Sequence, residues 1–219
     1  AHEVGALGVV DACQSVPHMP VDVRALKADA VAWSGHKMLG PTGIGALWST
    51  LLDRMPPFLT GGSMIQEVYM DHSTYAGGPK RFEAGTPLTA QAVGLAAAVR
   101  YLTDLGMTNV HAHEEHLTAY TLARLGNLPG VRVIGPTSMH DRGSAVSFVV
   151  DGIHPHDVGQ FLDDRGVAVR VGHHCAWPVC RRYEVPATTR ISTYVYNDES
   201  DIDAAVEAIT AAQSFFLAA

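Results

Sequence analysis

The sequence has 219 residues, of which 22 are acidic and 15 are basic, so its formal net charge is −7 with histidine neutral. This acidic balance argues against nonspecific binding to nucleic acid or to acidic membranes. Hydrophobic residues make up 47% and charged residues 17%, which excludes a disordered or collagen-like chain, and no uninterrupted apolar run approaches the roughly 18 residues of a membrane helix.

Three short apolar runs in the first 50 residues, at 7–11, 29–34 and 43–49, predict β-strands. Continuous apolar runs of this length suit strands that are buried on both faces of a parallel α/β sheet. Such strands present functional groups at their carboxyl ends. We therefore expect Asp11 and the turn Ser34-Gly-His-Lys37 to lie near one another.

The middle of the chain combines a long connection with two helices. Residues 56–87 are rich in Gly, Pro, Ser and Thr. A stretch of this length is too long for a structureless connection in a compact domain, so we expect it to be functional or interfacial. Residues 89–105 predict a helix with an alanine-rich stripe that Gly106 closes, and Thr108 is the expected cap of a second helix ending near residue 128.

After Pro129 and Gly130 the pattern changes to short strands that alternate with helices. The predicted strands are 131–134, 144–150, 167–171 and 188–196, and the predicted helices are 155–165 and 199–216. The second half of the chain is therefore expected to form an α+β unit distinct from the first half.

Lys37 and Asp11 carry the first chemical signal. A lysine on a turn after a buried strand could be desolvated, which would lower its pKa and let it form an imine with a carbonyl cofactor. The plain alternative is a surface lysine in a glycine-rich loop. An acid at one strand end and a lysine at the next are, however, the pair that a pyridoxal phosphate site requires. The acid holds the pyridine nitrogen protonated, and the lysine carries the Schiff base.

Five segments together resemble the SufS-type cysteine desulfurases, which are pyridoxal phosphate enzymes of the class V aminotransferase group. These segments are Val10-Asp-Ala-Cys-Gln14, Ser34-Gly-His-Lys37, Gly40-Pro-Thr-Gly43, Arg81-Phe-Glu-Ala-Gly-Thr86 and Arg170-Val-Gly-His-His-Cys-Ala176. The resemblance runs over essentially the whole chain. It implies an α/β fold in which residues 1–105 are the C-terminal part of a mainly parallel-sheet large domain that binds the cofactor, and residues 106–219 are a small C-terminal α+β domain.

The resemblance also implies which residues bind the cofactor. Lys37 would carry the Schiff base, Asp11 would bind the pyridinium nitrogen, and Gln14 would bind the phenolic oxygen. The phosphate would be held by Ser34 and His36, and by Thr89 from the neighbouring subunit of a homodimer.

For the substrate, the resemblance implies an L-cysteine whose carboxylate is clamped by Arg190, with Arg170 and His174 beside the reactive Cys175. A planar, bidentate donor suits that clamping role. The expected reaction converts L-cysteine to L-alanine, leaves a persulfide on Cys175, and supplies sulfur for iron–sulfur cluster assembly. Two alternatives are a selenocysteine lyase and a non-catalytic fragment of such an enzyme.

The cysteines allow other interpretations. Cys175 could be a buried, inert thiol, although nearby Arg and His residues would favour its thiolate. Cys13 is expected to be a small packed residue, and the role of Cys180 is open. Three cysteines are too few for a disulfide framework, which points to a reducing cytoplasm. We expect no metal, since the histidines beside Cys175, together with Cys180, lack the second ligand pair of a structural zinc site.

Two further histidine clusters are singled out. His111, His113 and His116 invite a metal site but do not match the H-E-x-x-H spacing, and a solvated helix face is the expected setting. The His154-Pro-His156-Asp157 segment opens a helix, where it could simply cap the first turn. The resemblance implies instead that His156 exchanges onto the zinc of a SufU-like sulfur acceptor, since a similar segment occurs in the branch of the family that uses one.

Chains of the resembled family are about twice this length, and their other half normally supplies the group that stacks on the pyridine ring and a phosphate-binding loop. The sequence also starts without an initiator Met. We therefore expect the C-terminal portion of a longer enzyme.

Overall fold

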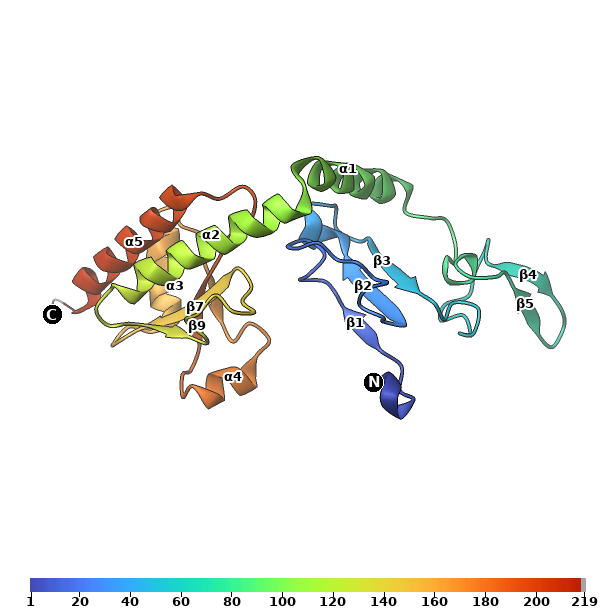
Figure 1. Cartoon of the computed structure of the whole chain (residues 1–219), viewed down its shortest axis with the longest axis horizontal. Coiled ribbons are helices and arrows are strands. Elements are labelled where there is room, and N and C mark those ends of the chain that lie inside the picture. Colours follow the sequence, from blue (N-terminus) through green and yellow to red (C-terminus); the bar gives the residue numbers. More distant parts are fainter. Residues whose placement is uncertain (218–219) are drawn as a thin grey trace. The chain divides into compact units, whose positions relative to one another are not determined.

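The computed structural model describes residues 1–217, which divide into two compact units (Figure 1). The first unit is Ala1–Asn109, and the second begins at Val110. Each unit has its own sheet and its own buried core. Among the helices of the described residues, none is both long and apolar enough to cross a membrane.

The first unit is built on a three-stranded sheet of order β1-β2-β3. Strand β1 (Val9–Asp11) runs parallel to β2 (Ala30–Ser34), whereas β3 (Gly45–Ser49) runs antiparallel to β2. The large domain was expected to have a mainly parallel sheet, and β3 is the antiparallel strand of this part of it. Residues 35–44 connect β2 to β3, and a parallel crossover needs about a dozen residues or more, so this link can only reverse the chain.

Burial on both faces of these strands was also predicted, and the structure contradicts it. A small core forms around Ala12, Ala28 and Val31. Val9, however, is 70% exposed and Leu47 is 49% exposed. These residues lie on β1 and β3, the two edges of the sheet, where a side chain has a neighbouring strand on one side only.

The connection 56–87 contains a β-hairpin that the sequence did not predict. Its strands are β4 (Ile65–Val68) and β5 (Ser73–Tyr75), and a short 3₁₀ helix, Lys80–Phe82, follows. Arg81 fastens this segment, because its Nε donates to the carbonyl of Ala76 (2.9 Å) and its Nη1 donates to the carbonyls of Asp53 (3.2 Å) and Met55 (3.0 Å). The stretch therefore has regular structure of its own, which agrees with the expectation that a segment of this length is not a structureless connection.

Helix α1 (Thr89–Leu105) has the predicted bounds. It ends at Gly106, whose φ of 81° is the left-handed conformation that glycine tolerates best, and whose N–H donates to the carbonyls of Leu102 and Thr103. Helix α2 (Met107–Gly126) begins one residue before Thr108. The predicted capping role of Thr108 is therefore wrong, since this residue lies inside the helix.

The second unit packs helices on one face of an antiparallel sheet, which is an α+β arrangement (Figure 1). Its strands, in the spatial order β6-β7-β9-β8, are β6 (Val131–Ile134), β7 (Ala145–Val150), β9 (Thr188–Ser192) and β8 (Arg170–Gly172). The covering helices are α2, α3 (Pro155–Asp163) and α5 (Glu199–Leu217). Fully buried residues of the core include Leu125, Phe148, Val158, Leu162 and Ile209.

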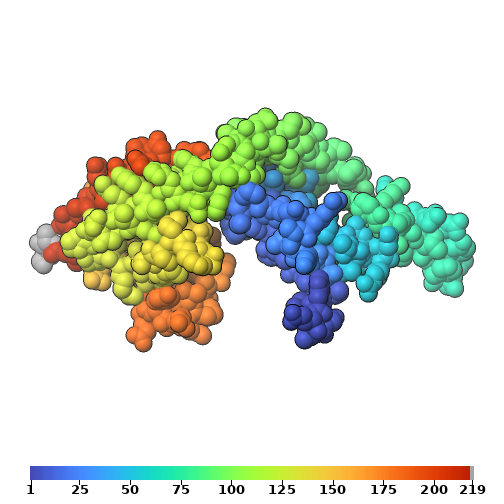
Figure 2. Space-filling view, in the orientation of Figure 1, coloured from blue at the N-terminus to red at the C-terminus, as the bar shows by residue number. Residues whose placement is uncertain are grey.

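Helix α4 (Trp177–Arg182) was not predicted. Its six residues are too few to show a helical period in the sequence. In the space-filling view, the orange segment that contains α4 stands out from the body of the second unit (Figure 2).

Candidate active site

In the first unit, the structure joins Asp11 to the start of the lysine turn through Cys13. Asp11 and Ser34 end the parallel strands β1 and β2. The backbone N–H of Cys13 donates to Asp11 Oδ1 (3.0 Å), and Cys13 Sγ lies 3.2 Å from Ser34 Oγ. Cys13 is therefore a hydrogen-bonding bridge and not simply a small packed residue. No sequence pattern signals this contact, which depends on the turn after β1.

The same contacts set the charge of Asp11. Hydrogen bonds from the backbone and the side chain of Cys13 lower the pKa of this carboxyl, and the Lys37 ammonium lowers it further, against the opposing effect of desolvation. Asp11 is thus ionised at neutral pH. An ionised carboxylate at this position suits a basic ring nitrogen, because it favours the protonated form of that nitrogen.

Lys37 lies on a 3₁₀ helix, Gly35–Met38, that directly follows β2. Gly35 and Met38 are buried and fasten the turn, whereas His36 and Lys37 are exposed. Of the two settings considered for Lys37, the structure therefore supports the surface lysine and not the desolvated one. Met38 is buried on one side of this short helix, so the two residues before it, His36 and Lys37, face solvent.

Gly40 holds the lysine turn against helix α1. A Cβ added to Gly40 would lie 2.8 Å from the carbonyl oxygen of Gly35 and 2.9 Å from Leu95 Cδ1. We expect Gly40→Ala to lower the free energy of unfolding by about 1–3 kcal/mol, because the backbone of the turn must shift. Urea unfolding measures the change. Gly62→Ala is the matched control, since a Cβ there meets nothing within 4 Å, and equal stability of the two variants would contradict the prediction.

The other residues assigned to the cofactor are accessible in the first unit. Gln14 is exposed just after Cys13, and Thr89 is exposed as the first residue of α1. Their roles, and that of His36, remain predictions.

In the second unit, Cys175 lies at the tip of a tight turn between β8 and α4. The N–H of Ala176 donates to the carbonyl of His173 (2.8 Å), and the two residues between them, His174 and Cys175, have φ values of 53° and 62°. Left-handed backbone costs a non-glycine residue roughly 1–2 kcal/mol, and such strain is concentrated at functional sites. Cys175 is a free, exposed thiol, so the alternative of a buried, inert thiol does not apply to it. Cys180 is the buried one.

His174 points from the turn toward the sheet. Its Nε2 lies 2.8 Å from Oγ1 of Thr188, a buried residue at the start of β9, and its Nδ1 is buried with no hydrogen-bond partner. Burial lowers the pKa of His174, and the nearby Arg190 and Arg170 charges lower it further. The imidazole is therefore neutral at neutral pH. The sequence did not single out Thr188, because only the folded sheet brings it to the turn.

Arg170 and Arg190 lie directly opposite one another on β8 and β9. Burial and the Arg170 charge lower the pKa of Arg190, and Arg190 Nε donates to Ser192 Oγ (2.9 Å). Among residues 1–217, no carboxylate forms an ion pair with either guanidinium. Like charges placed opposite on a sheet are unfavourable without a counter-ion. This pair therefore suits a ligand that carries a carboxylate.

His154 and His156 take different roles at the start of α3. His154 is the N-cap, and its Nδ1 accepts the backbone N–H of His156 at 3.3 Å. The side chain of His156 is exposed and does not cap the helix. Thr189 Oγ1 donates to the carbonyl of Pro155 (3.3 Å), which fastens this turn to β9.

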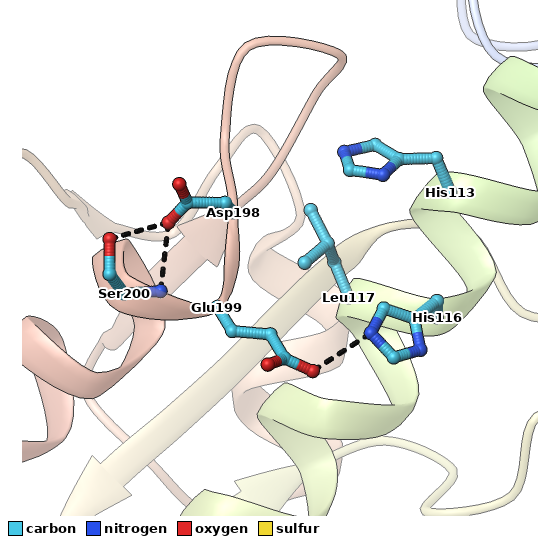
Figure 3. Close-up of a pocket in the computed structure, with 6 residues that line it drawn as sticks. All are labelled: His113, His116, Leu117, Asp198, Glu199 and Ser200. Carbon is cyan, nitrogen blue, oxygen red and sulfur yellow. Dashed lines mark hydrogen bonds and ion pairs between the residues drawn. The ribbon is translucent and has the colours of Figure 1, made fainter.

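Two histidines of the α2 cluster, His113 and His116, line a shallow pocket of about 490 Å³ between α2 and the start of α5 (Figure 3). His113 Nε2 lies 3.0 Å from the carbonyl oxygen of Asn197, and His116 Nε2 lies 2.9 Å from Glu199 Oε1. These contacts tie α2 to the residues that lead into α5. The expected solvated setting holds for His116, whose side chain is 62% exposed, whereas His113 is partly buried. Within the described part of the chain, no group of three or more His, Cys, Asp or Glu residues could hold a metal ion.

Comparison with known proteins gives consistent matches over almost the whole chain. The Aminotransferase class-V family profile matches residues 1–205. The chain is 58% identical to a probable cysteine desulfurase of Streptomyces coelicolor and 60% identical to probable cysteine desulfurase 2 of Mycobacterium leprae; each match covers 99% of this chain and 52% of the relative. Its fold is similar to the crystal structure of the cysteine desulfurase CsdA from Escherichia coli, with a TM-score of 0.92, 37% identity, and coverage of 99% of this chain and 54% of the other.

The chain thus spans about half the length of the relatives that it matches. The similarity to the solved structure confirms the α/β fold class predicted from the sequence, as a part of a larger fold.

Proposed function

The chain belongs to the class V aminotransferase family, and from this premise we propose that it is part of a pyridoxal phosphate-dependent cysteine desulfurase. The observation that carries the proposal is the exposed thiol of Cys175 on a left-handed turn. The preceding residue, His174, feels the charges of Arg170 and Arg190, a pair with no carboxylate partner in the described residues. The names of the relatives support the same activity. We further propose that residues 1–105 belong to the cofactor-binding large domain and residues 106–219 to the small C-terminal domain.

Pyridoxal 5′-phosphate is the cofactor of this family, and the donor set of the first unit fits it. Lys37 offers a primary amine for the aldehyde, and the ionised Asp11 carboxylate suits the ring nitrogen. The hydroxyl of Ser34 and the exposed His36 imidazole suit the phosphate, and the Gln14 amide suits the phenolic oxygen. In a homodimer, Thr89 would reach the phosphate of the neighbouring subunit.

When bound, the cofactor withdraws electrons from the substrate, which acidifies the Cα proton and weakens the Cβ–S bond. The Lys37 amine would move the Cα proton as a general base. Arg190 binds the substrate carboxylate with a planar, bidentate donor. The Cys175 thiolate attacks the substrate sulfur, so an S–S bond forms as the C–S bond breaks.

The balance of this reaction is L-cysteine plus the Cys175 thiol giving L-alanine plus the Cys175 persulfide, with no external oxidant or reductant. The neutral His174 adds no positive charge that would compete with Arg170 and Arg190 for the substrate carboxylate.

The test is incubation of the purified gene product with L-cysteine and pyridoxal phosphate. We expect equimolar alanine and persulfide in a single turnover, with the added sulfur on the Cys175 peptide in mass spectrometry. A folded protein that gives no cofactor absorbance would instead support a non-catalytic interaction fragment. Selenocysteine turnover that outpaces cysteine turnover would favour the lyase.

We propose a homodimer that uses the segment 56–87. Large apolar side chains of this segment are open to solvent in the first unit, with Phe58 91% exposed and Leu59 66% exposed. Covering such side chains favours association. Sedimentation of the cofactor-loaded protein as a monomer would contradict this proposal.

We also propose that the enzyme works in the cytoplasm and supplies sulfur for iron–sulfur cluster assembly through a zinc-bearing, SufU-like acceptor. The three free cysteines favour a reducing compartment. His156 is the proposed contact for the acceptor, because its imidazole is exposed and the capping of α3 is done by His154. An accessible, neutral imidazole can take a place on zinc and free an acceptor thiolate.

We expect His156→Ala to retain basal desulfuration with a small-molecule reductant and to lose stimulation by a zinc-bearing acceptor. The rate of alanine formation with and without the acceptor measures both effects. His140→Ala is the control, since that side chain is exposed on another loop. Stimulation that survives in the His156→Ala protein would show that the acceptor engages elsewhere.

A further inference from the structure

Two consecutive histidines hold the Cys175 turn from opposite sides. On the inner side, His174 is bonded to Thr188 of β9. On the outer side, the imidazole of His173 stacks on the indole of Trp177, with ring centroids 3.5 Å apart and planes inclined by 19°. His173 directly precedes the two left-handed residues, and Trp177 is the first residue of α4. The stack therefore joins the two ends of the turn.

The indole is presented by a helix that is itself anchored. Cys180 of α4 is 4% exposed, and its backbone N–H and that of Val179 donate to the carbonyl of Ala176 (3.3 and 3.0 Å). The Arg181 guanidinium lies 6.0 Å from the centroid of the Trp177 ring. Trp177 is nevertheless 54% exposed, on the segment that stands out in Figure 2. Its packing thus contributes little to the core and is directed at the turn.

We propose that the His173–Trp177 stack is a clip that keeps the Cys175 turn in its left-handed conformation, and that both residues position the nucleophile. Non-glycine residues disfavour this conformation, so two in succession persist only where surrounding contacts over-determine them. The backbone closes the turn by the Ala176 to His173 hydrogen bond. His173 supplies the acceptor of that bond, and Trp177 directly follows the donor Ala176. Stacking of their rings therefore keeps the donor and the acceptor together. The effect on the reaction rests on the proposed desulfurase function, whereas the effect on the turn does not.

The turn itself is tested by hydrogen exchange at single-residue resolution in the purified gene product. We expect Trp177→Ala to speed exchange of the Ala176 amide by at least about tenfold, because the hydrogen bond to His173 opens. Trp177→Phe retains an aromatic face and is expected to stay within about threefold of the native protein. Val179→Ala is the matched control, because it shortens another exposed side chain of α4. Native-like exchange of Ala176 in Trp177→Ala would overturn the clip.

The positioning role is tested on the same proteins by steady-state alanine formation at varied L-cysteine concentrations, with single-turnover persulfide formation as a second readout. We expect Trp177→Ala to lower kcat by at least about tenfold while KM for L-cysteine stays within about twofold, since the arginine pair is untouched. A native rate in Trp177→Ala despite faster exchange, or an equal loss in Trp177→Phe, would overturn the role. Faster exchange in Trp177→Ala with no persulfide even in the native protein would uphold the clip and refute the proposed function.

Discussion

Replacing Lys37 with alanine is expected to abolish the visible absorbance of the lysine-bound cofactor and to lower alanine formation by at least about 10³-fold. Two losses combine in this variant, because the amine that bonds the cofactor and the base that moves the Cα proton are the same atom. The absorbance is measured by titrating the purified protein with pyridoxal phosphate, and the rate is measured by alanine release.

Lys80→Ala is the matched control, since Lys80 is another exposed lysine of the first unit. It is expected to retain both the absorbance and the rate. Visible absorbance that persists in the Lys37→Ala protein and disappears in the Lys80→Ala protein would move the cofactor lysine to the 3₁₀ helix at 80–82.

The sequence predicted the regular elements best where the chain offers a long periodic pattern or a clear stop. Helix α1 has the expected bounds because its alanine-rich stripe ends at a glycine that adopts positive φ. Strand β6 also matches, since a Pro-Gly pair precedes it. Hairpin β4–β5 was missed because its turn lacks the Asn-Gly or Asp-Gly signal that favours a two-residue hairpin loop.

Strand direction was harder to predict than strand position. An apolar run such as β3 looks the same in a parallel and an antiparallel sheet, and only the length of the link to β2 distinguishes them. The exposure of β1 and β3 likewise depends on which strands lie beside them, which composition does not encode.

At the candidate site, residue types could be predicted while their supporting contacts could not. The sequence motifs single out Cys175, Arg170 and Arg190, and the structure exposes the thiol and sets the two arginines opposite one another. Their roles stay predictions. The Cys13 bridge and the His173–Trp177 stack depend on rotamers and on left-handed backbone at non-glycine residues, for which the sequence carries no local signal.

The second large effect is expected from Cys175→Ala, which should retain the visible absorbance of the cofactor and lose persulfide formation. The cofactor absorbance and persulfide formation are expected to respond differently because the thiol belongs to the second unit, whereas the proposed cofactor ligands of this chain belong to the first. Removing the thiol leaves the substrate sulfur without its nucleophile, so single-turnover persulfide should fall below detection while the cofactor still binds.

Cys180→Ala is the control for this variant, because Cys180 is the buried thiol of the same helix and turn region. It is expected to lose about 1 kcal/mol of stability through a small cavity and to retain the persulfide on Cys175. The exposed turn makes Cys175 the accessible thiol of this unit, whereas burial leaves Cys180 beyond the reach of a substrate. Undiminished cysteine turnover by Cys175→Ala would remove this residue from the reaction and with it the main support for the proposed desulfurase.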